Sequence, residues 1–444
     1  MQIVTRTSNR KIILDDEHHR QLLPKYIQII AGLVKDYPIV NKPEFKELVS
    51  FKRNRDLSIH RWFDYKHGYS DELVKKLIAL STSLEKNDYI LDPFVGTGTT
   101  LVTAQSLGLK SIGLDINPVA SFSAGTKTYL YSKKDLDEID DIINNIERYF
   151  SRSASVPKYL VFNDIFTEGQ LEQVLRIKGL YENIQERHIS DFFKLSYLSI
   201  IEDCSNRIKD GNGIKISRTK KPVKDVYQYF VNKCRLMLWD LKCTTRSTDA
   251  VVISGSILQD AIFEQIKGLP IGSIIFSPPY ANCFDYCEVY KMEIWLGDFV
   301  KDYSDFKKYR DLAIRSHVNS KFDPTIKNLN EEVDVIAALI GTYNVWNKNI
   351  PRMIKGYFDD MHETLSRLYA IGKPNSICAI AVANSGYKGI TVPTDLLLAR
   401  IAERIGYRVQ RIIVARQIRA SSQQIKELRE QGNLMRESII ILQR

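Results

Sequence analysis

Short β-branched or aromatic runs alternate along this chain with longer segments of helical hydrophobic spacing, and this alternation limits the folds it can adopt. Strands that alternate with helices are typical of a parallel sheet with crossover helices. Seven segments are predicted as strands: 89–91, 111–114, 250–254, 273–276, 376–382, 408–414 and 437–442. The last two are expected to pair as an antiparallel hairpin at one edge of the sheet, because the polar stretch between them holds little helix. The predicted class is α/β with a doubly wound, seven-stranded sheet.

The connection between the second and third predicted strands, residues 115–249, is far longer than a βαβ connection requires. Residues 126–249 are therefore predicted as an inserted lobe, mainly helical, with a basic stretch at 209–224. Residues 1–50 are predicted as a helical N-terminal extension. The sheet domain is then divided into two halves, residues 51–125 and 250–444.

The strongest local motif is the segment LDPFVGTGTT at 91–100, where a hydrophobic strand ends and a helix begins. In a doubly wound sheet this turn faces the ligand crevice. Gly96 and Gly98 let the backbone approach a ligand closely, and Asp92 is expected to meet a positively charged amino group. The segment lacks the third glycine of a dinucleotide fingerprint and the Gly-Lys-Ser/Thr of a phosphate loop.

Two further motifs follow later strands. Asp115, in GLDINP at 113–118, ends the second strand, where an acidic residue binds ribose hydroxyls in nucleoside-binding sheets; it could equally cap the next helix. Ser277-Pro278-Pro279-Tyr280 follows the fourth strand. The prolines restrict the backbone, so the Ser277 hydroxyl and the Pro278 carbonyl can accept hydrogen bonds from an exocyclic amine, while Tyr280 stacks on its base.

Together, DPFVGTGTT, GLDINP and SPPY resemble the motifs of the S-adenosylmethionine-dependent DNA methyltransferases that modify exocyclic amino groups, with the cofactor motif before the catalytic one. The resemblance covers residues 50–125 and 250–444 and implies a Rossmann-like methyltransferase fold. It implies a catalytic tetrad of Ser277, Pro278, Pro279 and Tyr280. It implies cofactor contacts from these residues: Tyr69, Ser70, Asp92, Pro93, Phe94, Gly96, Gly98, Thr99, Thr100, Asp115, Ile116 and Ser256.

One cofactor position departs from the family. After the third strand the family usually has Gly-Asp, whereas this chain has Gly255-Ser256. A neutral hydroxyl is a weaker acceptor than a carboxylate for the adenine amino group, and Asp260 is an alternative acceptor. By resemblance, a serine at the start of the tetrad favours cytosine N4 over adenine N6 as the target, and adenine N6 is retained as the alternative.

A formal net charge of +10 and a pI near 9.0 are compatible with a polyanionic partner. Double-stranded DNA is the expected substrate, recognised by the inserted lobe or by residues 301–360, where an apparent long loop carries Arg310, Arg315, His317 and Lys321. Strand-end candidates for the base pocket or for phosphate are Asn384–Tyr387, Arg416, Arg419, Ser421 and Ser422. The predicted DNA contacts are Lys215, Arg218, Lys220, Lys221 and Arg315; a solvated charged face explains each stretch as well.

The remaining expectations concern partners and surroundings. The six cysteines show no CxxC pair and no histidine at metal-ligand spacing, so reduced thiols and no metal are expected. A cytoplasmic enzyme of a restriction-modification system, with a cognate restriction endonuclease and without a membrane segment, is the leading hypothesis. The alternatives are methylation of RNA or protein amines on the same fold and a catalytically inactive nucleic-acid-binding subunit.

Overall fold

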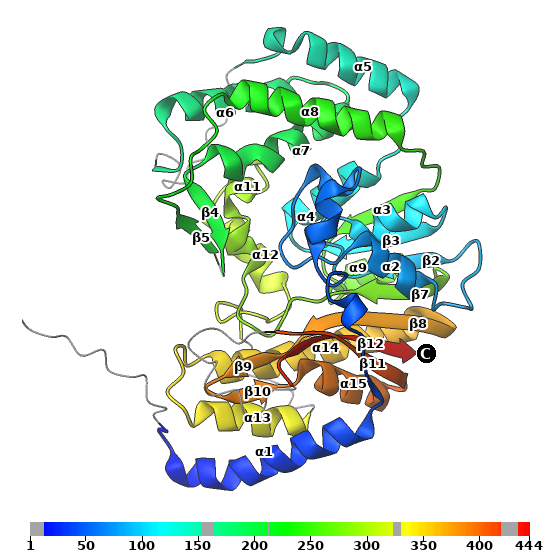
Figure 1. Ribbon diagram of the computed structural model, residues 1–444, viewed down its shortest axis with the longest axis vertical. Coiled ribbons are helices and arrows are strands. Elements are labelled where there is room, and N and C mark those ends of the chain that lie inside the picture. Colours follow the sequence, from blue (N-terminus) through cyan, green and yellow to red (C-terminus); the bar gives the residue numbers. More distant parts are fainter. Residues whose placement is uncertain (1–12, 152–163, 212, 323–329, 419–433) are drawn as a thin grey trace, which may run out of the picture.

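A twisted eight-stranded sheet forms the centre of the computed structural model, which describes residues 13–151, 164–211, 213–322, 330–418 and 434–444 (Figure 1). The strand order is β1-β11-β12-β8-β7-β2-β3-β6. The strands are β1 (Ile39–Asn41), β2 (Tyr89–Asp92), β3 (Lys110–Asp115), β6 (Ala250–Ser254), β7 (Ile271–Phe276), β8 (Gly372–Ala383), β11 (Arg408–Gln417) and β12 (Arg436–Gln443). The predicted α/β class and all seven predicted strands are confirmed.

The pairing at one edge differs from the prediction. β12 pairs antiparallel with both β11 and β8, while every other pair in the sheet is parallel. The antiparallel hairpin is therefore confirmed, but β1 pairs with β11 and takes the edge position. A strand of three residues carries too little periodicity to be recognised in the sequence.

Helices cover both faces of the sheet, because alternate strand residues point to opposite sides. In β7, Ile274 and Phe276 join one apolar core and Ile275 joins the other. The second core contains residues of α2 (Asp71–Ile78) and α3 (Thr99–Ser106). The first contains residues of α1 (Asp16–Asp36), α9 (Asp260–Ile266), α13 (Glu331–Gly341), α14 (Ile350–Ile371) and α15 (Thr394–Ile405).

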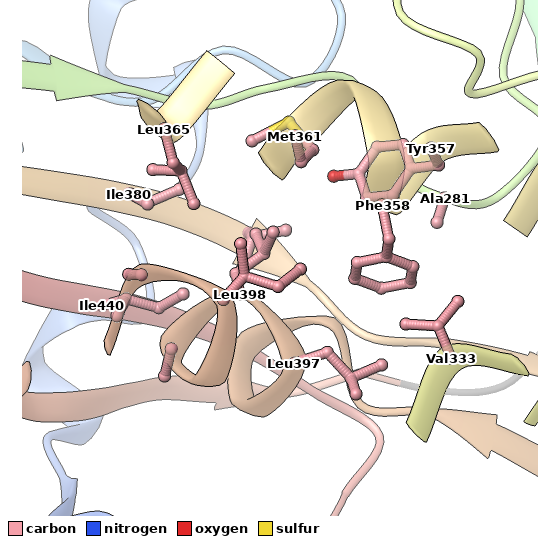
Figure 2. Close-up of a cluster of buried hydrophobic side chains, with 14 of the residues drawn as sticks. Ala281, Val333, Tyr357, Phe358, Met361, Leu365, Ile380, Leu397, Leu398 and Ile440 are labelled. Atoms are coloured by element: carbon pink, nitrogen blue, oxygen red, sulfur yellow. The ribbon is translucent and has the colours of Figure 1, made fainter. Parts of the chain in front are cut away.

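In the first core, α14 and α15 pack against each other, and α15 packs on β8 and β12. Figure 2 shows Phe358 and Met361 of α14 beside Leu397 and Leu398 of α15, with Ile380 from β8 in the same cluster. All five side chains are buried. This packing stabilises β8 and β12. The end of β8 and the start of β12 lie side by side and carry residues of the candidate site.

The inserted lobe is mainly helical, as predicted, and lies at the top of Figure 1. It consists of α5 (Lys133–Asn144), α6 (Glu168–Glu182), α7 (Arg187–Cys204) and α8 (Val226–Cys243), with an antiparallel hairpin of β4 (Arg207–Asp210) and β5 (Gly213–Ile216). Its apolar core also includes Trp62 and Trp295, which lie outside the insertion. The lobe therefore shares a core with both halves of the sheet domain.

A buried carboxylate in the inserted lobe forms hydrogen bonds with residues 59–62 of the N-terminal part of the chain. Asp240 of α8 accepts hydrogen bonds from the backbone N–H of Ile59, from the Arg61 guanidinium and from the Trp62 indole. Asp240 is fully buried, and these donors compensate its charge. The contact fixes the segment that precedes residues 64–68, which line the candidate site.

The remaining helices are α4 (Pro118–Thr128), α10 (Tyr286–Val289), α11 (Lys291–Leu296) and α12 (Tyr303–Leu312). A second hairpin pairs β9 (Ser385–Tyr387) with β10 (Ile390–Val392). The expectation of a long loop at 301–360 is wrong for the described residues, because α12, α13 and the start of α14 occupy most of that range. Within the described ranges, no helix is both long enough and apolar enough to cross a membrane.

Candidate active site

Two adjoining cavities lie at the edge of the sheet where the parallel strands end. The inner cavity is lined by residues at and after the ends of β2, β3, β6 and β7. The outer cavity lies between the inserted lobe, represented by Glu202 and Lys209, and the C-terminal half, represented by Arg416 and Glu437. Tyr65, His67 and Gly68 line both cavities.

The turn after β2 forms one wall of the inner cavity. Gly96 has a φ of +51°, and a Cβ there would lie 3.2 Å from the Tyr65 ring. Gly98 has a φ of +88° and is the N-cap residue of α3. Because glycine has no side chain, it supplies no side-chain acceptor to the first N–H groups of α3. Pro93, Phe94, Gly96, Thr97 and Thr99 line the cavity. The turn therefore offers backbone donors and a helix N-terminus to an anionic group of a ligand.

Asp92 does not line this cavity, in contrast to the expected contact with an amino group. Its carboxylate is buried and accepts hydrogen bonds from the Tyr69 hydroxyl at 2.7 Å, the Thr100 hydroxyl at 2.5 Å and the Phe94 N–H at 3.0 Å. Burial raises the pKa of Asp92 to about 6, against the effect of these donors. Asp92 thus stabilises the turn from inside the protein, and its hydrogen-bond partners Tyr69 and Phe94 line the cavity.

Two other residues that were predicted to contact the cofactor instead form hydrogen bonds within the protein. The Ser70 hydroxyl caps α2 by accepting from the Leu73 N–H, and Ser70 is buried. Thr100 is buried and bound to Asp92. A serine that precedes an amphipathic helix is a common N-cap. This capping role explains the position of Ser70 better than ligand binding does.

Asp115 and Ile116 lie together on the wall of the inner cavity after β3. The two oxygens of Asp115 accept from the N–H groups of Gly96 at 2.9 Å and Asn117 at 2.8 Å, and each oxygen can accept another donor. Burial raises the pKa of Asp115 to about 7. The Asn117 side chain caps α4, so the capping role that Asp115 could have filled belongs to its neighbour.

Ser256 also lines the inner cavity. Asp260, the alternative acceptor, is 91% exposed and paired with Arg367, and it does not line the cavity, so that alternative is wrong. The inner cavity is also lined by Asp285 and His317, both buried. Their Oδ2 and Nδ1 atoms make no hydrogen bond within the described residues, although Oδ2 lies 2.9 Å from Arg310 Nε in an ion pair.

The Ser-Pro-Pro-Tyr segment after β7 joins the two cavities. Ser277 and Pro279 line the inner cavity, whereas Tyr280 lines the outer one. Pro278 is buried between them.

The Tyr280 hydroxyl donates a hydrogen bond of 2.8 Å to Glu437, whose other oxygen accepts from Arg416 Nε at 2.6 Å. Glu437 is 3% exposed, and burial raises its pKa. Sequence reasoning missed Glu437, although a glutamate at the start of an apolar strand was a usable signal. Because β12 is antiparallel, its first residues lie at the same edge as the last residues of β7 and β8.

His67 stands where the two cavities meet. Its backbone has a φ of +62°, and its ring packs edge-on against Phe284 at 4.6 Å and lies 6.0 Å from the Tyr280 ring. Burial, with the charges of Lys66 and Arg416, lowers the pKa of His67 to about 4. The imidazole is therefore neutral at physiological pH.

The predicted DNA contacts are placed unevenly. Arg315 forms a two-point ion pair with Asp360 and donates its own backbone N–H to the same carboxylate. Its guanidinium is therefore engaged in a contact within the protein. Lys220 donates to the carbonyls of Glu202 and Arg207, and Lys215 pairs with Asp210. Arg218 and Lys221 are exposed and form no ion pair within the described residues. The candidates Arg419, Ser421 and Ser422 lie outside the described residues.

Comparisons with known proteins bear on the family of this chain. Residues 36–121 match the model of a family described as DNA methylase, of the N6/N4 amino-methyltransferase type. The type II methyltransferase M.BsoBI of Geobacillus stearothermophilus is 28% identical over 91% of this chain and 90% of its own length. The type II methyltransferase M.AvaI of a Nostoc strain is 26% identical over 89% of this chain and 88% of its own.

The inner cavity fits S-adenosylmethionine. Asp115 has free acceptor capacity for ribose hydroxyls, the start of α3 offers N–H groups to a carboxylate, and the buried His317 presents a ring nitrogen that makes no hydrogen bond within the described residues. Ser277 opens onto the same cavity. The motifs, the fold and these comparisons together support the amino-group DNA methyltransferase family, whose members take their methyl group from S-adenosylmethionine.

Proposed function

We propose that this protein is a site-specific DNA methyltransferase that methylates the exocyclic N4 of cytosine as part of a type II restriction-modification system. The observation that carries the proposal is the position of the SPPY segment, whose first residue opens onto the cofactor cavity and whose last residue opens onto the outer cavity. A base extruded from a duplex into the outer cavity would bring its amino group to Ser277 with its ring against Tyr280.

The chemistry follows from the weakness of the nucleophile. The lone pair of an exocyclic amine is delocalised into the ring, so acceptors that bind both N–H groups favour a pyramidal, more nucleophilic nitrogen. The Ser277 hydroxyl and the Pro278 carbonyl supply these acceptors, and the two prolines restrict their positions. Bound S-adenosylmethionine supplies the electrophilic methyl group. The amine loses its proton after transfer, so no strong general base is required.

The outer cavity supports DNA as the substrate, because it separates the inserted lobe from the C-terminal half and has cationic residues on several walls. Lys52, Lys66 and Arg416 line it. We assign target recognition to the inserted lobe, residues 126–249, since residues 301–360 are largely helical and Arg315 is bound to Asp360. Both relatives reported above are named type II methyltransferases, and we propose that a cognate restriction endonuclease recognises the same sequence.

The choice between cytosine N4 and adenine N6 is tested by expression in a host that lacks DNA methylation. Its DNA is digested to nucleosides and analysed by mass spectrometry, and single-molecule sequencing of the same DNA gives the modified sequence. We expect N4-methylcytosine in one sequence context and none from Ser277→Ala. N6-methyladenine in place of N4-methylcytosine would contradict the base assignment, and modification of RNA alone would contradict the substrate class.

A further inference from the structure

Arg416 reaches the outer cavity at the end of a buried hydrogen-bonded chain. The Tyr280 hydroxyl binds one oxygen of Glu437, and the other oxygen binds Arg416 Nε at 2.6 Å. Glu437 has almost no exposed surface, so this chain joins the ring expected to stack on the extruded base to the guanidinium beside it. The position of the guanidinium is thereby tied to that of the Tyr280 ring.

The contact with Glu437 uses only one of the five N–H donors of the guanidinium. Within the described residues, the two terminal nitrogens of Arg416 form no hydrogen bond or ion pair, and Arg416 is one of the residues that line the outer cavity. The same cavity is bordered by His67, whose pKa is lowered in part by the charge of Arg416. In the described part of the chain, Arg416 therefore has four unpaired N–H donors, on two nitrogens, and lines the same cavity as Tyr280 and His67.

The edge of cytosine next to its amino group presents two adjacent acceptors, N3 and O2. An arginine fork binds two adjacent acceptors, as it does with the O6 and N7 of guanine. Adenine presents N1 next to its amino group, followed by a C–H, and so lacks the second acceptor. An arginine in this place therefore distinguishes the two bases by chemistry alone.

We propose that Arg416 is the specificity-determining residue that reads N3 and O2 of the extruded cytosine, held in place by Glu437. This inference rests on the proposed function and deepens it by naming the residue that selects the base. Glu437 is a positioning residue, because it contacts Arg416 and Tyr280 and directs both. A backbone phosphate is the competing partner for a guanidinium, and the experiment below separates the two.

The test compares wild type and Arg416→Met on two duplexes that carry the sequence modified in the expression host. One duplex holds cytosine at the target position and the other holds 3-deazacytosine, which keeps the amino group and O2 but lacks N3. The changes in amine reactivity and base pairing caused by the analogue act on both enzymes and cancel in the comparison. We expect the analogue to slow single-turnover methylation by wild type roughly tenfold more than it slows Arg416→Met.

Two further variants guard against a change of fold. Arg408→Met removes an exposed arginine at the opposite end of β11, and it should show the wild-type penalty for the analogue. Glu437→Gln keeps an acceptor for Tyr280 but removes the charge that holds Arg416, and it should reduce that penalty. Circular dichroism melting curves establish whether each variant is folded.

The outcomes separate this inference from the proposed function. Equal penalties in wild type and Arg416→Met would overturn the inference while N4-methylcytosine remained the product. A fall of about one unit in the salt dependence of DNA binding, together with equal penalties, would assign Arg416 to a phosphate. If the wild-type product is N6-methyladenine, the proposed function itself fails before the comparison is made.

Discussion

Asp115 makes the affinity for the cofactor depend on pH in a way that the structure predicts. Burial raises its pKa to about 7, so in the free protein at pH 6 only about one molecule in eleven carries the carboxylate. The carboxylate is the form that accepts hydrogen bonds from two ribose hydroxyls with full capacity, whereas the protonated group loses part of that capacity. Ligand binding is therefore expected to favour the charged form.

The magnitude follows from linkage. If binding requires the carboxylate, affinity is constant above pH 7 and falls about tenfold for each pH unit below it, which amounts to about 2.7 kcal/mol at pH 5. The sign is that of a group whose pKa falls on binding: a proton is released, and affinity rises with pH up to the pKa of the free protein. Stability of the ligand-free fold changes in the opposite direction, because a raised carboxyl pKa lowers the free energy of unfolding as the pH rises from about 4 to 7.

Calorimetric titration with S-adenosylhomocysteine from pH 5.5 to 8.5 measures this dependence. Asp115→Asn is the matched control, because it keeps one acceptor and the size of the side chain but cannot titrate. Every other ionisable group of ligand and protein remains in the variant, including Asp92 with its pKa of about 6, so the difference between the curves isolates Asp115. Parallel curves for the two proteins would refute the reasoning, as would affinity that is constant down to pH 5.5.

Three other predictions address the tetrad, the turn and the lobe. Ser277→Ala should lower single-turnover methylation by about 10²-fold or more and leave S-adenosylhomocysteine affinity unchanged, because the lost acceptor acts on the amine. Asp92→Ala should lower both cofactor affinity and the melting temperature, since it leaves the Tyr69 and Thr100 hydroxyls and the Phe94 N–H without their acceptor, at about 1–3 kcal/mol for each unpaired group. Arg218→Ala and Lys221→Ala should each reduce the salt slope of DNA binding by about 0.9, whereas Lys215→Ala, which breaks an ion pair with Asp210, should change it less.

Each of these predictions can fail in a defined way. A wild-type rate for Ser277→Ala would make the SPPY segment a structural turn. Unchanged melting of Asp92→Ala would contradict the network described for the turn. An unchanged slope in both hairpin variants would place the phosphate contacts elsewhere on the walls of the outer cavity.

The structure also changes what is expected of Tyr280. If only stacking by the flat ring mattered, phenylalanine could replace Tyr280. The Tyr280 hydroxyl, however, donates a hydrogen bond to Glu437, which is almost completely buried. Tyr280→Phe would leave one oxygen of that carboxylate without its donor. The replacement should therefore weaken the hold on Arg416 even where stacking is kept.

The sequence alone determined seven of the eight strands of the main sheet, their α/β order and the three motifs, because these depend on local patterns. The seven strands are marked by short apolar runs, and the turn at 92–100 by glycines that adopt a positive φ. The insertion was visible as chain length between two strands. Each signal lies within a few consecutive residues, or in the spacing between them, and requires no knowledge of packing.

Only the tertiary structure decided which side chains meet. Asp92 looked free to bind a ligand until Tyr69 and Thr100 were seen to occupy its carboxylate, and Arg315 looked free until Asp360 was found beside it. Glu437 joined the site because β12 runs antiparallel and brings its first residues to the edge where β7 and β8 end. Such pairings depend on strand direction and on contacts between residues far apart in the chain, and no local pattern encodes them.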